Sequence, residues 1–235
     1  MSDQLVSRDT WLKARLELLD REKAFTKERD ALSAARRKLP MVLIGKDYEF
    51  DTEAGPKSLA ELFGGKSQLI VYHFMFAPNW AEGCPSCSFW CDHFNGIDVH
   101  LAARNTALVI AANAPLKTLL DYRDRMGWTL NWVSAGQTTF GQDFGVTFPA
   151  SGGGEDPVYN YTGQPHGEES PGLSVFTRLT DGRVAHSYST YGRGLDILNT
   201  AYHLLDMTPK GRDEDSLVFS MAWLKRRDEY QTAAE

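Results

Sequence analysis

The pattern of hydrophobic and polar positions predicts an α/β fold built around two buried strands. The runs SQLIVYHFMF (67–76) and TALVIAA (106–112) are apolar at consecutive positions rather than at alternating ones. Strands of this kind are buried on both faces, as in the centre of an α/β sheet. The pattern also predicts, in chain order, a short strand at 48–50, a short helix at 58–63, helices at 84–104 and 115–126, a strand at 130–133, strands at 173–178 and 184–190 joined by the turn Asp181-Gly182, and a helix at 194–206.

This order of elements indicates one domain over residues 41–207. Strand-helix units come first and an antiparallel hairpin with its covering helix comes last, which predicts a mixed sheet flanked by helices. The glycine run Gly152–Gly154 lacks the Lys-Ser/Thr of a phosphate-binding loop, so we expect no nucleotide site there.

Helical extensions are predicted on both sides of this domain. In residues 1–40, one stripe of a helix carries Leu12, Leu16 and Leu19. A single narrow stripe fits a helix that packs on its own domain, and it also fits an arm that forms a homodimer. Residues 208–235 are expected to hold one more helix, with one face made by Leu217, Met221 and Leu224.

The composition excludes several classes of function. The chain has 235 residues and a formal net charge of −6, which gives no basic surface for nucleic acid. The N-terminus lacks the apolar core of a signal peptide, and no stretch is long enough to cross a bilayer, so no membrane partner is expected. The cysteines number three and all lie between positions 84 and 91. Such close spacing in an intracellular chain indicates redox or metal chemistry, and we expect a cytoplasmic protein.

The motif Cys84-Pro85-Ser86-Cys87 follows the first buried strand and a loop, and it opens a predicted helix. At a helix start, unpaired backbone N–H groups and the helix dipole stabilise a thiolate, so the pKa of Cys84 should be lowered. Cys87 lies one turn deeper and can close a disulfide with Cys84. The positions predict Cys84 as the attacking thiolate and Cys87 as the resolving thiol.

Two segments carry a resemblance to the thioredoxin superfamily. The segment LIVYHFMFAPNWAEGCPSC is similar to its strand-loop-CxxC region, and SPGLSVF, followed by Asp181-Gly182, is similar to its cis-proline strand and hairpin. The resemblance implies a thioredoxin-like fold in which Pro171 follows a cis bond, packs against the dithiol and positions the substrate. The segment GKDYEFDTEAGPKSLAELFGGK resembles the peroxiredoxin-like branch, where a hairpin and a short helix precede the active strand.

Nearly the full length of the chain resembles the bacterial family called domain of unknown function 899 (DUF899). The stretches that carry this resemblance are GCPSCSFWCDHFNG, DFGVTF, LLDMTPKGRDE and the region from PGLSVFTR to HSYSTYGRG. Proteins of this family are described as predicted dithiol-disulfide oxidoreductases. The resemblance implies thiol-disulfide exchange with an unidentified protein or small-molecule thiol or disulfide. No bound cofactor is needed, because the cysteine sulfurs themselves carry the electrons that are exchanged.

Other residues are candidates for supporting roles. His73, in the middle of the active strand, either relays protons to the inner sulfur or is a core histidine whose polar groups are satisfied. Trp80 in the loop before the dithiol could line a substrate face. Three residues that follow the hairpin strand could reach the site or lie at the surface, namely Tyr188, Tyr191 and Arg193.

The third cysteine leaves a metal-binding alternative open. Cys91 is a buried structural thiol, a third redox thiol, or a metal ligand. With Cys84, Cys87 and His93 it would give the pattern C-x2-C-x3-C-x-H, four possible zinc ligands in a module without catalysis.

A thioredoxin-fold peroxidase is the second alternative. That activity uses a Thr three residues before its reactive cysteine and a Pro seven residues before it. The corresponding positions before Cys84 hold Ala81 and Ala77, and Pro78 is one residue out of place. The missing hydroxyl removes a group that orients peroxide and thiolate, so the departure counts against this reading.

Overall fold

The computed structural model describes residues 5–148, 157–165 and 167–230. The glycine run Gly152–Gly154 lies outside these residues. The chain divides into two units, residues 1–40 and residues 41–235, and each unit is described by itself. In the part of the chain that the structure describes, no helix has the length and apolar character needed to cross a bilayer.

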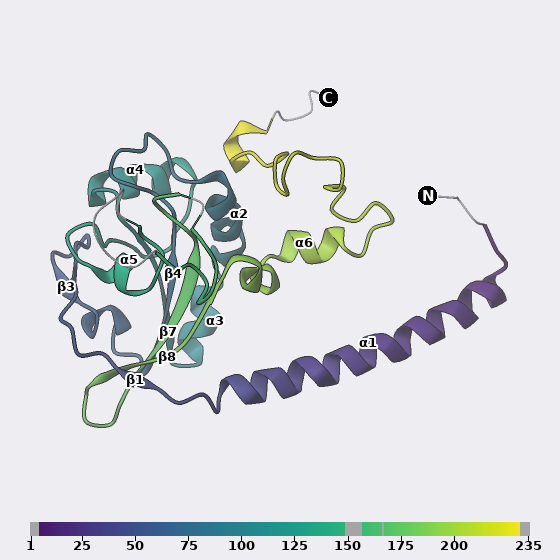
Figure 1. Ribbon diagram of the computed structural model, residues 1–235, viewed down its shortest axis with the longest axis horizontal. Helices are drawn as coiled ribbons and strands as arrows, with labels where there is room; N and C mark the ends of the chain where they lie inside the picture. Colours follow the sequence, from purple (N-terminus) through teal and green to yellow (C-terminus); the bar gives the residue numbers. More distant parts are fainter. Residues whose placement is uncertain (1–4, 149–156, 166, 231–235) are drawn as a thin grey trace. The chain divides into compact units, whose positions relative to one another are not determined.

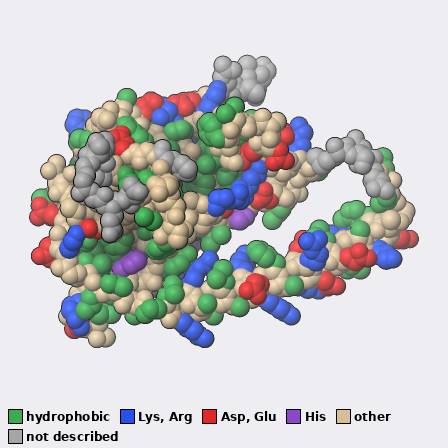
Figure 2. All heavy atoms as spheres, in the orientation of Figure 1, with side chains coloured by type: hydrophobic (Ala, Val, Ile, Leu, Met, Phe, Trp, Pro, Cys, Tyr) green, Lys and Arg blue, Asp and Glu red, His purple; other side chains and the backbone are tan. Residues whose placement is uncertain are grey.

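The first unit consists of helix α1, Arg8–Arg36. Ser7 caps its start, because the Ser7 Oγ accepts a hydrogen bond from the Thr10 backbone N–H at 3.2 Å. None of the residues of α1 is buried. Hydrophobic side chains are interspersed with charged ones along its surface (Figure 2).

The second unit is built on a mixed sheet. Its strands in the described residues are β1 (Val42–Leu43), β4 (Gln68–His73), β5 (Thr106–Ala112), β6 (Trp132–Ser134), β7 (Gly172–Arg178) and β8 (Val184–Tyr191), and they lie in the order β1-β8-β7-β4-β5-β6. Strands β4, β5 and β6 are parallel, whereas β7 runs antiparallel to β4 and forms a hairpin with β8. This is the thioredoxin-like arrangement, so the predicted fold class is confirmed.

Helices cover both faces of this sheet (Figure 1). One face packs against α2 (Pro85–Phe94), α3 (Asp98–Ala103), α4 (Leu116–Arg125) and α6 (Thr200–Leu205). The other face packs against α5 (Phe140–Asp143) and against a small β2–β3 hairpin (Glu49–Phe50 and Lys57–Ser58) with its 3-10 helix η1 (Glu61–Phe63). Because side chains alternate along β4 and its continuation, Tyr72 and Phe74 face α2, whereas Val71 and His73 face α5.

Two predicted long helices are broken. The helix predicted over 84–104 is divided into α2 and α3, and Gly96 between them has a φ of +87° that an α-helix does not allow. The helix predicted over 194–206 is divided into the 3-10 helix η2 (Gly192–Leu198) and α6. Asn199 separates these two because its Oδ1 accepts the Tyr202 N–H at 3.0 Å and so starts a new helix.

The prediction of an α-helix in the C-terminal extension is wrong for the described residues 208–230, whose regular structure is the short 3-10 helix η3 (Arg227–Glu229). The carboxylate of Glu214 gives the physical reason. Its Oε1 accepts hydrogen bonds from the Tyr202 hydroxyl at 2.8 Å, the Trp223 Nε1 at 2.7 Å and the Met221 backbone N–H at 3.0 Å. In an α-helix that Met221 N–H would bond to the backbone four residues earlier, and its φ of +70° also excludes a helix.

Candidate active site

Cys84 and Cys87 lie at the start of α2 as free thiols. Cys84 is the N-cap residue and is partly exposed, whereas Cys87 is only 1% exposed. The backbone of Met75, just after β4, binds both cysteines. Its carbonyl accepts the Cys84 N–H at 3.1 Å, and its N–H donates to the Cys87 Sγ at 3.4 Å. The backbone just after β4 therefore fixes the two cysteines relative to each other.

The two thiols have opposite pKa shifts. The pKa of Cys84 is lowered to about 6, chiefly by hydrogen bonding with the Cys87 thiol. Burial opposes this shift, whereas hydrogen bonding from the backbone N–H groups of Cys87 and Ser86 lowers the pKa further. Burial raises the pKa of Cys87 well above its ordinary value, and the neighbouring Cys84 raises it further. At neutral pH the pair therefore holds a thiolate at Cys84 and a thiol at Cys87.

The phenol of Tyr72 lies next to the dithiol, although nothing in the sequence pattern singles it out. Tyr72 is fully buried on β4, and its ring packs edge-on against Phe94 with centroids 5.1 Å apart. Its side chain acts on the pKa of Cys87 in the lowering direction, which favours the thiolate form, although burial of Cys87 is the larger effect. Burial, followed by the charge of Cys87, raises the pKa of Tyr72 itself, so the phenol stays protonated and can donate.

The hypothesis that His73 relays protons to the dithiol needs correction. His73 lies on the opposite face of the sheet, with its ring 5.4 Å from that of Phe140. Its Nε2 shares a hydrogen bond with the Ser174 Oγ at 2.8 Å, and burial lowers its pKa to about 3. The Ser174 Oγ is in turn 2.8 Å from that of Ser189. His73 is thus a neutral core histidine with its polar group satisfied, the other interpretation of this residue.

A carboxylate two residues before Cys84 is neutralised. Glu82 forms ion pairs with Arg125 of α4 and with Arg226, the latter at 2.9 Å. A lone carboxylate there would disfavour the Cys84 thiolate, so these two arginines remove an opposing charge. Arg226 comes from the C-terminal extension and is largely buried.

Arg226 also holds the backbone around Cys84. Its Nη2 and Nε donate to the Gly83 carbonyl at 2.8 and 3.2 Å, and its Nε also lies 3.1 Å from the Tyr122 hydroxyl. That hydroxyl shares a hydrogen bond with the Ser88 Oγ at 2.7 Å, and the Ser88 Oγ donates to the Cys84 carbonyl at 2.8 Å. The backbone carbonyls of Gly83 and of Cys84 itself are therefore both bound by one hydrogen-bond network.

Pro171 lies beside the dithiol, but the Ser170–Pro171 bond is not cis, because the described residues contain no cis peptide bond. The expectation of a cis bond, carried by the resemblance, is wrong. Hydrogen bonds hold the backbone on both sides of the trans bond, which is also the intrinsically favoured isomer. The Ser170 N–H donates to the Val146 carbonyl at 2.8 Å, and the Tyr159 hydroxyl donates to the Pro171 carbonyl at 2.6 Å.

Trp80 and Cys91 occupy different surroundings. The half-buried indole of Trp80 donates from Nε1 to the Glu168 carboxylate at 2.7 Å. Cys91 is fully buried, as expected for a structural thiol, and burial raises its pKa. The His93 Nε2 accepts the Ala201 N–H at 3.4 Å. Among the described residues, no three His, Cys, Asp or Glu side chains are grouped so that they could hold a metal ion.

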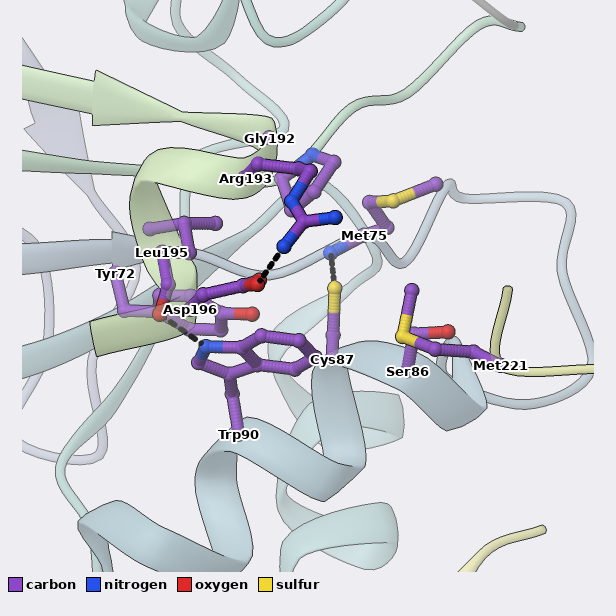
Figure 3. Close-up of a pocket in the computed structure, with 11 residues that line it drawn as sticks. Tyr72, Met75, Ser86, Cys87, Trp90, Gly192, Arg193, Leu195, Asp196 and Met221 are labelled. Atoms are coloured by element: carbon purple, nitrogen blue, oxygen red, sulfur yellow. Dashed lines mark hydrogen bonds and ion pairs between the residues drawn. The ribbon is translucent and has the colours of Figure 1, made fainter. Parts of the chain in front are cut away.

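A cavity of about 200 Å³ opens beside Cys87 (Figure 3). The sulfur of Cys87 points to the Met75 backbone nitrogen at its edge. The cavity is lined by Tyr72, Met75, Ser86, Cys87, Trp90, Pro171, Gly192, Arg193, Leu195, Asp196 and Met221.

The comparison with protein families gives a match over residues 1–230 to the model described as a bacterial protein of unknown function, DUF899. The chain belongs to this family. The comparison of this DUF899 protein with curated proteins gave no match.

Solved structures similar to this DUF899 protein include two peroxiredoxins. Peroxidoxin BcpB from Mycobacterium tuberculosis is 17% identical with a TM-score of 0.47, over 69% of this chain and 93% of that one. Peroxiredoxin Q from Xanthomonas campestris is 12% identical with a TM-score of 0.47, over 69% of this chain and 95% of that one. A putative thiol-disulfide oxidoreductase from Bacteroides vulgatus is 15% identical with a TM-score of 0.40, over 70% of this chain and 97% of that one.

Proposed function

We propose that this protein is a thiol-disulfide oxidoreductase that uses Cys84 and Cys87 as a redox pair. The observation that carries the proposal is the asymmetry of the two thiols. Cys84 is partly exposed with a pKa of about 6, and Cys87 is buried with a raised pKa. An attacking thiol should have a pKa near ambient pH, and a resolving thiol should stay protonated until it is needed.

In the first step the Cys84 thiolate attacks one sulfur of a substrate disulfide. A Cys84–substrate disulfide forms, the substrate S–S bond breaks, and one substrate thiolate leaves. The hydrogen bonds on the two carbonyls beside Cys84 keep the nucleophile in position during this attack. Pro171 and Trp80 are proposed to position the substrate.

In the second step Cys87 gives its proton to the thiolate released first and attacks the Cys84 sulfur. The Cys84–Cys87 disulfide forms and the second substrate thiolate leaves, so the protein has given two electrons to the substrate. The Tyr72 hydroxyl and the Met75 N–H stabilise the Cys87 thiolate at this moment. An external thiol reductant returns the pair to the dithiol, and no bound cofactor takes part.

A redox titration tests this function. The purified protein is equilibrated in buffers of oxidised and reduced dithiothreitol, quenched with acid, and mapped by mass spectrometry. We expect a reversible Cys84–Cys87 disulfide with a two-electron dependence, about 30 mV for each tenfold change. A Cys91→Ser variant should keep the same midpoint.

Metal content is measured on the same preparation, because it separates the metal-binding alternative. Stoichiometric zinc, together with no Cys84–Cys87 disulfide at any ratio of the buffer, would contradict a redox role. Peroxide consumption at a rate that keeps pace with thiol oxidation would instead favour the peroxidase.

A further inference from the structure

The cavity beside Cys87 has apolar walls that come from four parts of the chain. The segment just after β4 contributes Met75, helix α2 contributes Trp90, and η2 contributes Leu195. The fourth wall is Met221 of the C-terminal extension. Met221 is placed there by the hydrogen bond of its N–H to Glu214. Cys87 itself lines the cavity, so the cavity adjoins the dithiol, and Met221 of the C-terminal extension closes its fourth side.

Two polar side chains that line this cavity, Trp90 and Asp196, already have partners. The Trp90 Nε1 donates to the Leu195 carbonyl at 2.8 Å (Figure 3). The carboxylate of Asp196 lies 3.0 Å from the guanidinium of Arg193 and 3.0 Å from that of Arg212. The Arg193 side chain is 86% exposed, so it lies at the rim. A charged ligand group placed inside would lose its hydration, and the two charged side chains of the lining, Arg193 and Asp196, already pair with each other.

We infer that this cavity receives an apolar group of the substrate, of leucine to phenylalanine size, carried next to the disulfide that Cys84 attacks. The inference rests on the proposed function and names its substrate class. An apolar cavity of about 150 Å³ takes a molecule as large as benzene, so about 200 Å³ is sufficient for such a group. The charged arms of glutathione disulfide fit this cavity poorly.

The free energy of burying the apolar group sets how strongly the protein should prefer an apolar substrate over a polar one. Placing a large apolar side chain in such a pocket rather than a small polar one changes kcat/KM by about tenfold to a hundredfold. The effect should depend on the walls that touch the group. Met221→Gln keeps the length of the side chain but makes the wall polar. Val218→Ser changes a residue of the same extension that is 97% exposed and lies outside the cavity, which makes it the matched control.

The test uses two disulfide-linked peptides of equal length and charge that differ only beside the cysteine, Phe in one and Ser in the other. We expect wild type and Val218→Ser to reduce the Phe peptide at least about tenfold faster in kcat/KM. Met221→Gln should lose most of this preference while its Cys84 alkylation rate and thermal unfolding stay unchanged. Dibenzyl disulfide against hydroxyethyl disulfide, measured in the same way, shows whether the group must belong to a polypeptide.

The outcomes separate the cavity from the chemistry. If dibenzyl disulfide is also reduced faster than hydroxyethyl disulfide, the cavity recognises an apolar group of any carrier. If only the peptides show the preference, the cavity recognises an apolar side chain of a polypeptide. Equal rates for the two peptides, or a preference that survives in Met221→Gln, would overturn the inference and leave the exchange reaction standing. Reduction of none of the four disulfides would overturn the proposed function itself.

Discussion

The guanidinium of Arg226 donates two hydrogen bonds to the carbonyl of Gly83, the residue before Cys84, across 143 positions of sequence. The same guanidinium pairs with Glu82. The C-terminal extension thus reaches the backbone and the charge next to the attacking sulfur. A thioredoxin-like sheet with a dithiol could exist without this contact, so Arg226 is a positioning residue whose effect on Cys84 can be measured.

Replacement of Arg226 should raise the pKa of Cys84. In Arg226→Ala, Glu82 keeps only Arg125 as a counter-charge and the Gly83 carbonyl loses its donors. We expect the pH profile of Cys84 alkylation, with a midpoint near 6 in wild type, to move up by about 0.5 to 1 on the pH scale. Arg226→Lys should move it less, because the charge is kept. Arg183→Ala, at an exposed hairpin pair, is the control, and equal profiles for all four proteins would assign Arg226 a purely structural role.

Removal of the Tyr72 hydroxyl should slow the second step only. Tyr72→Phe keeps the ring packing but removes the hydroxyl that lowers the pKa of Cys87. We expect the mixed disulfide at Cys84 to last about tenfold longer in stopped-flow reduction of a substrate, with the alkylation profile of Cys84 unchanged. Tyr48→Phe, which removes a hydroxyl bonded to Asp143 on the other face of the sheet, should match wild type. A Tyr72→Phe variant with normal resolution would remove Tyr72 from the mechanism.

His73 should affect acid stability and leave exchange intact. Its pKa is about 3 in the folded protein against an ordinary 6.5, so the unfolded chain binds the extra proton between these values. The neutral His73 therefore makes its full contribution to the free energy of unfolding above pH 6.5. That contribution falls as the pH drops below 6.5, by about 2 kcal/mol at pH 5. In His73→Gln, the difference in urea unfolding free energy between pH 7 and pH 5 should shrink by about that amount, with His186 still contributing. Loss of exchange activity in a folded His73→Gln would reinstate the relay hypothesis.

Gly83 should not tolerate a side chain. A Cβ built there lies 2.6 Å from the Phe74 Cε1 and 2.7 Å from the Tyr122 Cε1, and both rings are buried. We expect Gly83→Ala to destabilise the protein by about 1 to 3 kcal/mol in urea unfolding. A Cβ at Gly45 meets nothing within 4 Å, so Gly45→Ala is the control. Equal stability of the two variants would mean that the loop before Cys84 has room that the structure does not show.

The sequence predicted the sheet and the dithiol because both depend on local patterns. The consecutive apolar residues of β4 and β5 and the Asp181-Gly182 turn identify their elements without knowledge of the rest of the chain. The breaks at Gly96 and Asn199 were missed, since each depends on one residue within a helical pattern. The C-terminal helix was wrong because Leu217, Met221 and Leu224 fit a helix only if Glu214 does not take the Met221 N–H.

The supporting residues of the site could not be predicted in the same way. A strand that is apolar on both faces does not show which face meets α2. The sequence therefore could not decide whether Tyr72 or His73 points toward the dithiol. Arg226 reaches Gly83 only through the path of the extension, and no local pattern encodes that contact. The expectation of a cis bond at Pro171 came from the resemblance alone, and the structure has the trans isomer that X–Pro bonds ordinarily favour.

Trapping of mixed disulfides tests the central claim most directly. Cys87→Ser and Cys84→Ser variants are mixed with a disulfide-linked peptide, separated on non-reducing gels, and the linked cysteine is identified by peptide mapping. Cys87→Ser should accumulate a covalent complex through Cys84, because the complex forms but cannot be resolved. Cys84→Ser should accumulate almost none, since Cys87 is buried with a raised pKa. Equal trapping by both variants, or none by either, would contradict the assignment of Cys84 as the attacking thiolate.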